Sequence, residues 1–505
     1  MTLVDNLKNT TAAYPDTFAY LFLGDTCTYG EFFEQVKNAA AYLADLGIGK
    51  GDNVALLLGN SPHFVVSFYG TLLTGATVVP INPIYTPHEI EFILKNSGAR
   101  VVFAVEQLLP VFENLKPQLP ELEHVVFTSG QTPHDWTHPY DELSLRANRD
   151  WEGPLVQEED VAVILYTSGT TGTPKGAMLT HRNLTSNAES IARYLKVDRS
   201  DRVVAVLPMF HVFCMTVCLN AAVVLGSTLV IIPRFSPGDV MKTIRETKAT
   251  IFAGVPTMYN FLLHTPDGKP EDLSSLRVCI SGGAALPVAL MQSFEAKFNK
   301  VIYEGYGLSE ASPVTAFNPV DGVRKPGSIG ISIPDVESKI VDEEDLEVPL
   351  GQVGELVVRG PNVMKGYFRM PEETAMALRN GWLHTGDMAR MDEDGYIFIV
   401  DRKKDMIIVG GFNVYPREVE EALYQHSSIV EAVVIGVPDE NFGEAVHAYV
   451  VTKDHTLTEE SIQEYCRGEL AKYKVPHKVI FIEDLPKNTT GKIMRRVLRD
   501  QVMRG

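Results

Sequence analysis

The sequence predicts an α/β protein with a large N-terminal lobe of α/β layers, a β-rich subdomain and a small α+β C-terminal lobe. Its 505 residues exceed what one hydrophobic core usually serves. Two stretches, 53–87 and 202–233, repeat the order strand, helix, strand. After Val336 the pattern changes to alternating strands with Gly and Asp turns. A final mixed region opens at 401–407, and we therefore expect domains at 1–403 and 404–505.

Within these regions the stretches 53–87 and 212–233 carry no charge, which raises the question of membrane insertion. Gly, Asn or Pro divides both into pieces shorter than the roughly 20 apolar residues that a membrane span needs. Each reads instead as two buried strands around a helix: strands 53–59, 76–81, 202–208 and 227–232, with helices 63–75 and 212–226. We therefore expect two related α/β layers and no transmembrane segment.

Further short strands follow, and most end in glycine-containing loops. They are expected at 249–254, 276–283 and 301–307 in the large lobe, and at 337–342, 354–360 and 395–400 in the β-rich unit. Ligands of open α/β sheets bind at the carboxyl ends of the strands. The loops after the first three strands are therefore candidate parts of a binding site.

The charge and the cysteines narrow the class of protein. The net charge of −19 argues against a nucleic-acid partner, which needs a basic face. The region from Arg402 onward is close to neutral, as expected of a lobe that meets phosphates. Five cysteines, an odd number, indicate a reduced, cytoplasmic protein, and the N-terminus has no signal-peptide pattern. A homodimer is left open.

The segment 166–179, YTSGTTGTPKGAML, predicts a phosphate-binding loop. Its glycines let backbone amides converge on an anion, its hydroxyls donate hydrogen bonds, and Lys175 supplies a counter-charge. The spacing is not that of a Walker A loop, because Pro174 stands where that motif needs glycine. The candidate phosphate-binding residues are Thr167, Ser168, Gly169, Thr170, Thr171, Gly172 and Lys175.

Five further motifs follow this loop in order: YEGYGLSEASP at 303–313, TGD at 385–387, DRKKD at 401–405, GGFNVYP at 410–416 and PKNTTGK at 486–492. Together with the loop they resemble the signatures of the adenylate-forming superfamily, which contains acyl- and aryl-CoA ligases, nonribosomal peptide adenylation domains and firefly-type luciferases. The resemblance implies a two-step reaction with ATP, Mg²⁺ and coenzyme A. A carboxylate attacks the α-phosphorus of ATP and releases pyrophosphate, and a thiol then attacks the acyl-adenylate.

The resemblance also implies roles for individual residues. Lys492 matches the catalytic lysine of the first step, and Glu310 matches the Mg²⁺ ligand. Asp387 and Arg402 match the pair that holds the ribose. The residues expected at the rest of the nucleotide are Gly283, Ala284, Glu304, Gly305, Tyr306, Gly307 and Ser309, with Tyr306 stacked on adenine. Two of them depart from many relatives, since Ser309 replaces threonine and Glu304 replaces glutamine.

Three more expectations concern the second step and the lobe rotation that the family uses. His211 is expected to border the carboxylate, although a lone histidine at a helix start is as often structural. The pair Gly410 and Gly411 is expected to line the pantetheine tunnel, where missing side chains permit close approach. Lys404 occupies the hinge position between the lobes.

The identity of the acid rests on an uncharged run at 212–222, where amino-acid-activating domains usually place an aspartate. A pocket of Phe213, Met215, Val217 and Phe252 would reject an ammonium group, because an unpaired buried charge is costly. The run looks most like bacterial medium- to long-chain fatty acyl-CoA ligases. An aryl-CoA ligase of the 4-coumarate or benzoate type is the alternative. An enzyme that loads a carrier protein and a luciferase-type oxygenase remain less favoured readings.

Overall fold

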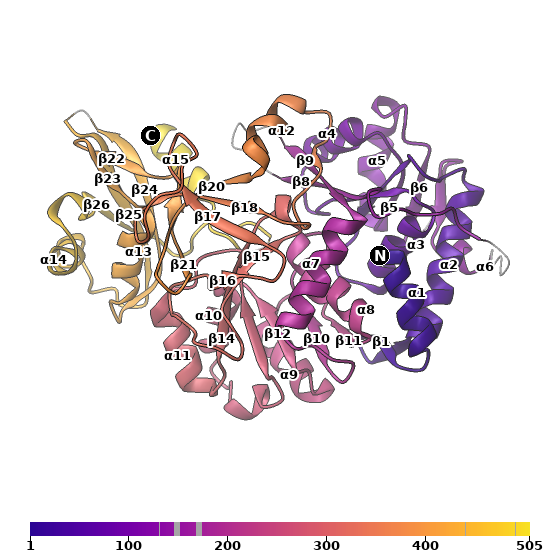
Figure 1. Ribbon diagram of the computed structural model, residues 1–505, viewed down its shortest axis with the longest axis horizontal. Coiled ribbons are helices and arrows are strands. Elements are labelled where there is room, and N and C mark those ends of the chain that lie inside the picture. Colours follow the sequence, from indigo (N-terminus) through magenta and orange to yellow (C-terminus); the bar gives the residue numbers. More distant parts are fainter. Residues whose placement is uncertain (131, 146–151, 168–173, 440, 490, 505) are drawn as a thin grey trace.

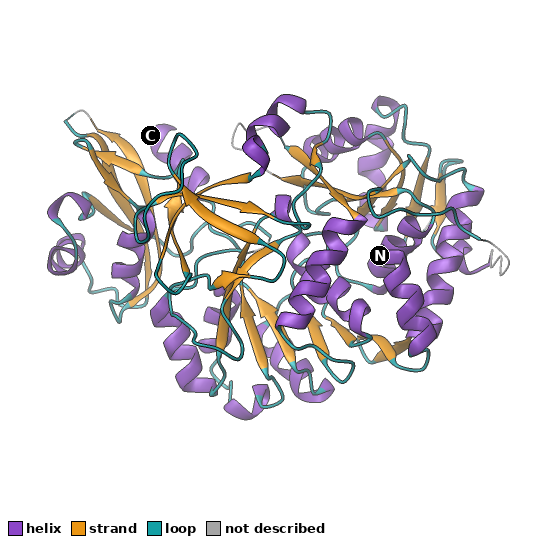
Figure 2. Cartoon of the chain, in the orientation of Figure 1, coloured by secondary structure: helices purple, strands orange, loops and turns teal. Residues whose placement is uncertain are grey.

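The computed structural model describes the chain except for residues 131, 146–151, 168–173, 440, 490 and 505. The chain runs from the N-terminal half at the right of Figure 1 through a central part to a C-terminal part at the left. Helices cover the sheets in the large part, and strands dominate the centre (Figure 2). The described helices include none long and apolar enough to cross a membrane.

An eight-stranded sheet lies in the N-terminal half. Its order is β19 (Gly366–Tyr367), β9 (Lys175–Thr180), β8 (Val161–Thr167), β4 (Thr77–Pro80), β3 (Asn53–Leu57), β5 (Ala99–Ala104), β6 (His124–Phe127) and β7 (Thr137–Pro139). From β8 to β7 all pairs are parallel, and β8 and β9 form an antiparallel hairpin. The hairpin loop is the expected phosphate-binding loop.

A nine-stranded sheet forms the central part. Its order is β16 (Ile331–Ser332), β15 (Val314–Phe317), β14 (Ile302–Gly307), β13 (Val278–Ser281), β12 (Ile251–Gly254), β10 (Arg202–Ala205), β11 (Thr228–Ile231), β1 (Phe18–Phe22) and β2 (Asp25–Thr28). The strands from β14 to β1 are parallel, so their carboxyl ends share one edge. This confirms the two α/β layers predicted from the repeated strand, helix, strand pattern.

Helices fill the space between the two sheets and cover their outer faces. Alternate residues of β3 show this arrangement: Val54 and Leu56 join the main core, whereas Ala55 and Leu57 pack with α4 and α5 on the opposite face. The helices of this large part are α1 (Leu3–Ala13), α2 (Tyr29–Asp45), α3 (Pro62–Leu73), α4 (Pro87–Ser97), α5 (Leu109–Leu115), α6 (Glu142–Leu145), α7 (His181–Tyr194), α8 (Ala221–Leu225), α9 (Pro237–Thr247), α10 (Pro256–Leu263) and α11 (Val288–Phe298).

One helix differs from the prediction. The helix expected at 212–226 is a π-helix over Cys214–Asn220 that continues as α8. A π-helix is rare, and π-bulges often occur at functional sites. Short 3₁₀ helices occur at Glu106–Leu108, Lys116–Gln118, Pro270–Leu273, Ser309–Ala311, Arg379–Gly381 and Lys472–Lys474.

A four-stranded antiparallel sheet is the β-rich unit. It consists of β17 (Glu337–Val341), β18 (Gly354–Arg359), β20 (Leu383–Met391) and β21 (Ile397–Arg402), with α12 (Pro371–Ala377) beside it. The sequence predicted three of these strands. It missed β20, which contains the motif 385–387, because polar residues interrupt its alternation.

The C-terminal part has its own five-stranded sheet, reached through a turn at 403–405. The strands are β22 (Ile407–Val409), β23 (Phe412–Val414), β24 (Ile429–Asp439), β25 (Gly443–Thr452) and β26 (Lys478–Phe481), and the helices are α13 (Pro416–Tyr424), α14 (Glu459–Glu469) and α15 (Arg495–Arg504). A separate hydrophobic cluster lies between this sheet and α13 and α14. That core makes it a structural unit distinct from the four-stranded sheet.

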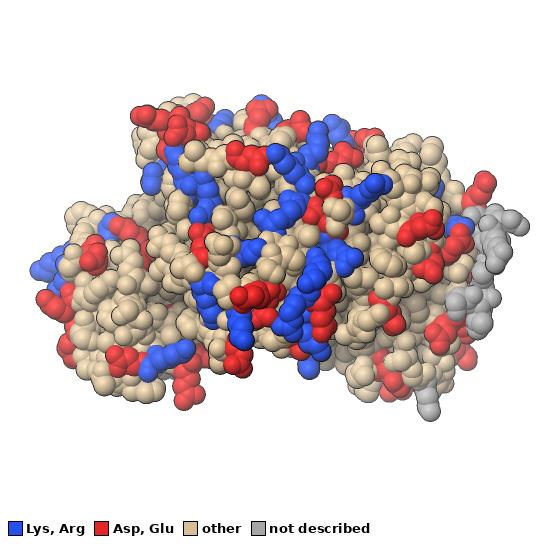
Figure 3. Space-filling view, turned by 90° about the horizontal axis from the view of Figure 1, so that it is seen from below, with Lys and Arg blue, Asp and Glu red and all other residues tan. Residues whose placement is uncertain are grey.

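Basic and acidic side chains are interleaved on the face shown in Figure 3, with Lys and Arg concentrated near its centre. In the nine-stranded region several basic groups are paired: the Arg277 guanidinium contacts Asp201 at 2.5 Å and that of Arg245 contacts Asp272 at 2.5 Å. Such pairing leaves those cations less available to an anionic polymer.

Candidate functional site

A cavity of about 1850 Å³ lies where the carboxyl ends of the nine-stranded sheet, the four-stranded sheet and the C-terminal part meet. Most of the candidate residues line it, although they come from segments far apart in the sequence. They are Thr167, Lys175, His211, Phe213, Val217, Gly283, Ala284, Glu304, Gly305, Tyr306, Gly307, Ser309, Glu310, Asp387, Arg402, Lys404 and Lys492.

The β8–β9 hairpin presents Lys175 to one end of this cavity. The Lys175 Nζ lies 5.3 Å from the centre of the Tyr367 ring, and the Tyr367 hydroxyl donates to Glu310 Oε1 at 2.9 Å. One tyrosine thus contacts both a cation, through its ring, and a carboxylate, through its hydroxyl. The expected phosphate ligands Ser168, Gly169, Thr170, Thr171 and Gly172 lie outside the described residues.

Asp387 and Arg402 are cross-strand partners in the β20–β21 ladder. The Arg402 Nε lies 3.5 Å from Asp387 Oδ1, and the Tyr306 hydroxyl donates to Asp387 Oδ2. Burial and the Asp387 charge raise the pKa of Tyr306 well above its usual value, so Tyr306 remains a hydrogen-bond donor. The three side chains form one wall with a carboxylate at its centre.

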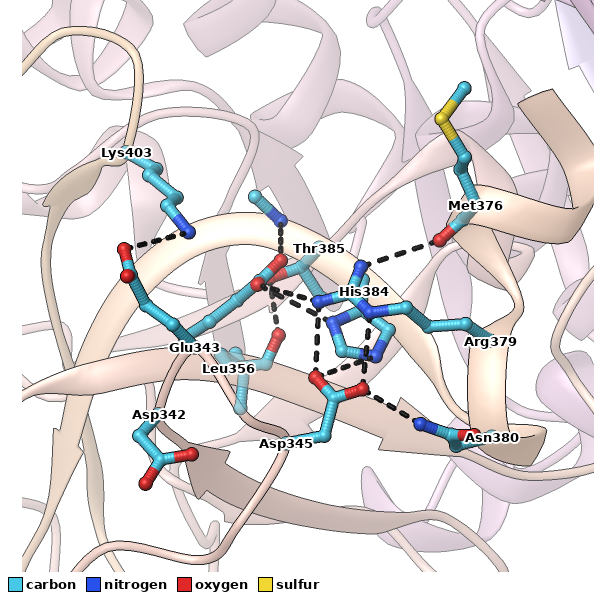
Figure 4. A network of polar contacts seen from close by, with 12 residues as sticks. Asp342, Glu343, Asp345, Leu356, Met376, Arg379, Asn380, His384, Thr385 and Lys403 are labelled. Atoms are coloured by element: carbon cyan, nitrogen blue, oxygen red, sulfur yellow. Dashed lines mark hydrogen bonds and ion pairs between the residues drawn. The ribbon is translucent and has the colours of Figure 1, made fainter.

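A network that the sequence analysis missed holds the backbone next to Asp387. Glu355 Oε1 accepts the Gly386 N–H at 3.1 Å, and its Oε2 lies 3.4 Å from His384 Nδ1. Figure 4 shows His384 and Arg379 facing Asp345, which Arg379 Nη2 contacts at 3.1 Å. A glutamate inside the apolar strand 354–359 was the available signal, because a buried acid needs partners.

Glu304 lies in the wall beside Gly283 and Ala284 with only 4% of its surface exposed. Its Oε1 accepts the Leu286 N–H at 3.1 Å. Burial raises the pKa of Glu304 to about 7, although the charge of Arg417 acts in the opposite direction. A Cβ at Gly305 would lie 2.2 Å from the Phe317 ring, so glycine there lets β14 and β15 approach closely.

Lys492 reaches the cavity from the C-terminal part. Its N–H donates to Asn488 Oδ1 at 2.9 Å, which closes the turn that presents the side chain. Burial and the Arg402 charge lower the pKa of Lys492 to about 8, so the amine is still mostly charged at neutral pH.

His211 lies within the field of the same lysine. Burial and the Lys492 charge lower the pKa of His211 to about 4, so the imidazole is neutral at neutral pH. Its Nδ1 accepts the Phe213 N–H at 3.3 Å, which leaves the proton on Nε2. A neutral donor therefore stands near the buried cation.

The expected acyl pocket divides into wall and core. Phe213 and Val217 line the cavity, whereas Met215 and Phe252 are 0% exposed and do not. Met215 and Phe252 therefore belong to the core, which corrects their placement. Phe252 packs edge to face against Tyr259 at 5.5 Å. The apolar wall continues through residues of the β12–α10 region and α11 that the sequence did not indicate: Val255, Leu263, Ala289 and Leu290.

The glycine pair lies away from the cavity, whereas Lys404 lies at its edge. Gly410 and Gly411, with φ angles of 57° and 85°, form the exposed β22–β23 turn, and neither lines the cavity. Lys404 is exposed in the turn between β21 and β22 at the cavity edge. The tunnel and hinge roles stay predictions, because both refer to a different arrangement of the two parts.

The described residues contain no group of three or more His, Cys, Asp or Glu side chains arranged to hold a metal ion. The role of Glu310 as a Mg²⁺ ligand stays a prediction that involves one carboxylate. That suits Mg²⁺, which usually takes one or two protein carboxylates and completes its shell with phosphate and water.

The chain is similar to known proteins over almost its whole length. Residues 7–368 match the family described as AMP-binding enzyme, and residues 418–492 match the AMP-binding enzyme C-terminal domain. The long-chain-fatty-acid–CoA ligase of Bacillus subtilis strain 168 is 42% identical, over 99% of this chain and 94% of that protein.

Two solved structures of one protein, MatB from Rhodopseudomonas palustris, bear on the arrangement of the parts. Both are 33% identical to this chain and cover 99% of it and of themselves. The ATP-bound structure gives a TM-score of 0.92 and the apo structure one of 0.82. As a whole, the present structure is therefore more similar to the ATP-bound one.

Proposed function

The chain belongs to the AMP-binding enzyme family, and we propose that it is an ATP-dependent ligase that joins a long-chain fatty acid to coenzyme A. The observation that carries this is the 42% identity over nearly the whole length to a long-chain-fatty-acid–CoA ligase. The cavity supports it, because charged and polar groups gather at one end and an uncharged wall of Phe213 and Val217 lies at another.

In the first step a carboxylate oxygen bonds to the α-phosphorus of ATP while the bond to pyrophosphate breaks. Two anions must approach each other, so a positioned cation lowers the barrier. Lys492 supplies that charge. His211 is neutral at neutral pH and can donate a hydrogen bond from Nε2 to the carboxylate. It forms no ion pair with the carboxylate that would reduce its nucleophilicity.

The nucleotide is held by the other residues of the cavity. Asp387 accepts from the ribose hydroxyls, and Arg402 donates beside it. Tyr306, Gly283 and Ala284 enclose the adenine. Glu304, Gly305, Gly307 and Ser309 line the same cavity, and we assign them to the nucleotide. We assign Thr167 and Lys175 to the phosphates. Mg²⁺, when bound, would be held by Glu310 and would neutralise phosphate charge.

In the second step the coenzyme A thiol attacks the carbonyl carbon, and AMP leaves. Gly410 and Gly411 must approach the cavity for this step, since they lie outside it here. We assign the movement to rotation of residues 404–505 against 1–403 about Lys404. The single turn at 403–405, between two sheets with separate cores, supports this assignment.

Location and assembly complete the proposal. All five cysteines are free and buried, as in a protein of the reducing cytoplasm. Whether the chain forms a homodimer is decided by light scattering on the purified protein.

The test is a pyrophosphate-release assay with fatty acids of increasing length, aryl acids and amino acids, each with and without coenzyme A. We expect the highest kcat/KM with long-chain fatty acids and thioester formation only with coenzyme A. A preference for benzoate or coumarate would favour the aryl-CoA ligase, and turnover of an amino acid would overturn both.

A further inference from the structure

The loop that carries Lys492 is hydrogen-bonded to both walls of the cavity. On one side the Asn82 Nδ2 donates to Thr489 Oγ1 at 2.9 Å. On the other the Thr257 Oγ1 donates to the Gly491 carbonyl at 2.9 Å. Asn82 follows β4 of the eight-stranded sheet, and Thr257 lies in the first turn of α10, after β12 of the nine-stranded sheet. Each large sheet thus contributes one bond.

Within the C-terminal part this loop has its own support. The Gly491 N–H donates to the Asn488 carbonyl at 2.9 Å, and the Asn488 N–H donates to the Lys492 carbonyl at 2.9 Å. After the loop, Arg495 Nη2 contacts Glu420 Oε1 of α13 at 2.7 Å. These bonds move with the C-terminal part as one body, so they do not depend on its position against the large part.

The bonds from Asn82 and Thr257 do depend on that position. Gly491 also packs closely, because a Cβ built on it would lie 3.0 Å from Val255 Cγ2. Asn82 is buried, and its Oδ1 accepts the Ile84 N–H at 3.2 Å, which orients its amide toward Thr489. A rotation of the C-terminal part would break both bonds together.

We propose that Asn82 and Thr257 are positioning residues that seat the Lys492 loop for the adenylation step alone. They touch neither the reacting carboxylate nor the phosphates in this proposal, and they act through the backbone and hydroxyl of the loop. Losing them shifts the equilibrium away from the arrangement in which Lys492 lies in the cavity. The assignment of the half-reaction rests on the proposed function, whereas the seating itself does not.

The first experiment separates the half-reactions in single turnover. The variants are Asn82→Ala and Thr257→Val, and Thr257→Ser, which keeps the hydroxyl, is the matched control. We expect acyl-adenylate formation to fall about tenfold in the first two, as for loss of one hydrogen bond. The rate of thioester formation from supplied acyl-adenylate should stay within about twofold of the wild-type rate. An equal fall in both steps, or an equal loss in Thr257→Ser, overturns the proposal.

A double-variant cycle identifies the partner of Asn82. If Asn82→Ala and Thr489→Val remove the same bond, the double variant should adenylate about as fast as either single one. If the rate losses of the two single variants multiply in the double variant, the two side chains act independently, which contradicts the proposed bond.

A second measurement does not depend on the substrate. The rate at which an amine-reactive reagent modifies Lys492, followed by peptide mass spectrometry without substrate, reports how firmly the loop is seated. We expect faster modification in Asn82→Ala and Thr257→Val than in wild type and Thr257→Ser. Equal rates in all four proteins would overturn the seating even if the enzyme is a fatty acyl-CoA ligase. A wild type that adenylates no fatty acid would instead refute the proposed substrate and leave this readout intact.

Discussion

Two of the charged groups that face the nucleotide in our proposal, Asp387 and Lys492, are held in different ways. Asp387 lies inside a β-ladder, and its carboxylate contacts the Arg402 guanidinium and the Tyr306 hydroxyl. Glu355 accepts a hydrogen bond from the N–H of the preceding residue, Gly386. Lys492 lies on a loop that two hydrogen bonds join to the large part. In our proposal Asp387 is therefore a fixed element of both half-reactions, whereas Lys492 is brought in for one of them.

Removing the lysine charge tests this contrast most strongly. Lys492→Ala should lower the adenylation rate by roughly 10²-fold or more, because a cation positioned for the transition state is lost. Thioester formation from preformed acyl-adenylate should be largely unchanged. Single-turnover assays of each half-reaction measure both rates.

Asp387→Asn is the matched comparison for the lysine variant. This variant should lower the rates of both half-reactions together, because in our scheme the contacts of the Asp387 carboxylate are the same in both. If Lys492→Ala also reduced both steps equally, the lysine would be as fixed as Asp387 and the contrast would fail.

Blocking the movement is the second test. Lys404→Pro fixes φ near about −65° and restricts Lys403, so it should retain ATP-pyrophosphate exchange and lose most thioester formation. The N–H groups of Lys403 and Asp405, which donate to the carbonyls of Gly386 and Arg402, both remain in this variant. Lys404→Ala is the control. Undiminished thioester formation in the proline variant would exclude rotation at this residue.

The pH dependence sharpens the contrast without a substitution. Because the pKa of Lys492 is lowered to about 8, its charge is present below that pH and lost above it. The kcat/KM of adenylation should therefore fall above about pH 8, approaching tenfold for each further pH unit. Thioester formation should not fall there, since its thiol nucleophile ionises as pH rises. A flat adenylation profile up to pH 10, about the usual lysine value, would show that the charge of Lys492 is not required.

The last prediction concerns stability at the fixed side of the cavity and not the rate of either step. Glu304 keeps its proton up to about pH 7 when folded but loses it near 4.5 when unfolded, so its contribution is lost as pH rises across this range. The full difference is roughly 3 kcal/mol. Glu304→Gln should therefore gain melting temperature over wild type at pH 8 but not below about pH 4.5, the unfolded value. Scanning calorimetry at both pH values decides it, and an equal difference at both would show that the charge is not buried.

Local sequence patterns predicted most of the fold and the main site residues. They did not predict contacts between residues that are distant in the sequence. Apolar runs indicated the two α/β layers, and motif order placed Lys492 and Asp387 at one site. The assignment of Met215 and Phe252 to the cavity wall was wrong in placement, because composition does not reveal which side of a helix or strand faces a cavity. The bonds from Asn82 and Thr257 were not predictable, since they join residues separated by hundreds of positions.

The π-helix at Cys214–Asn220 bears on how this chain can change its substrate. A π-helix accommodates more residues per turn than an α-helix, so deleting one residue within it would restore the ordinary pitch. Side chains within the segment, Val217 among them, would then take new directions relative to Phe213, while those of α8 would keep theirs. A single-codon deletion could thereby reshape the apolar wall in one evolutionary step, a change that substitution at one position does not achieve.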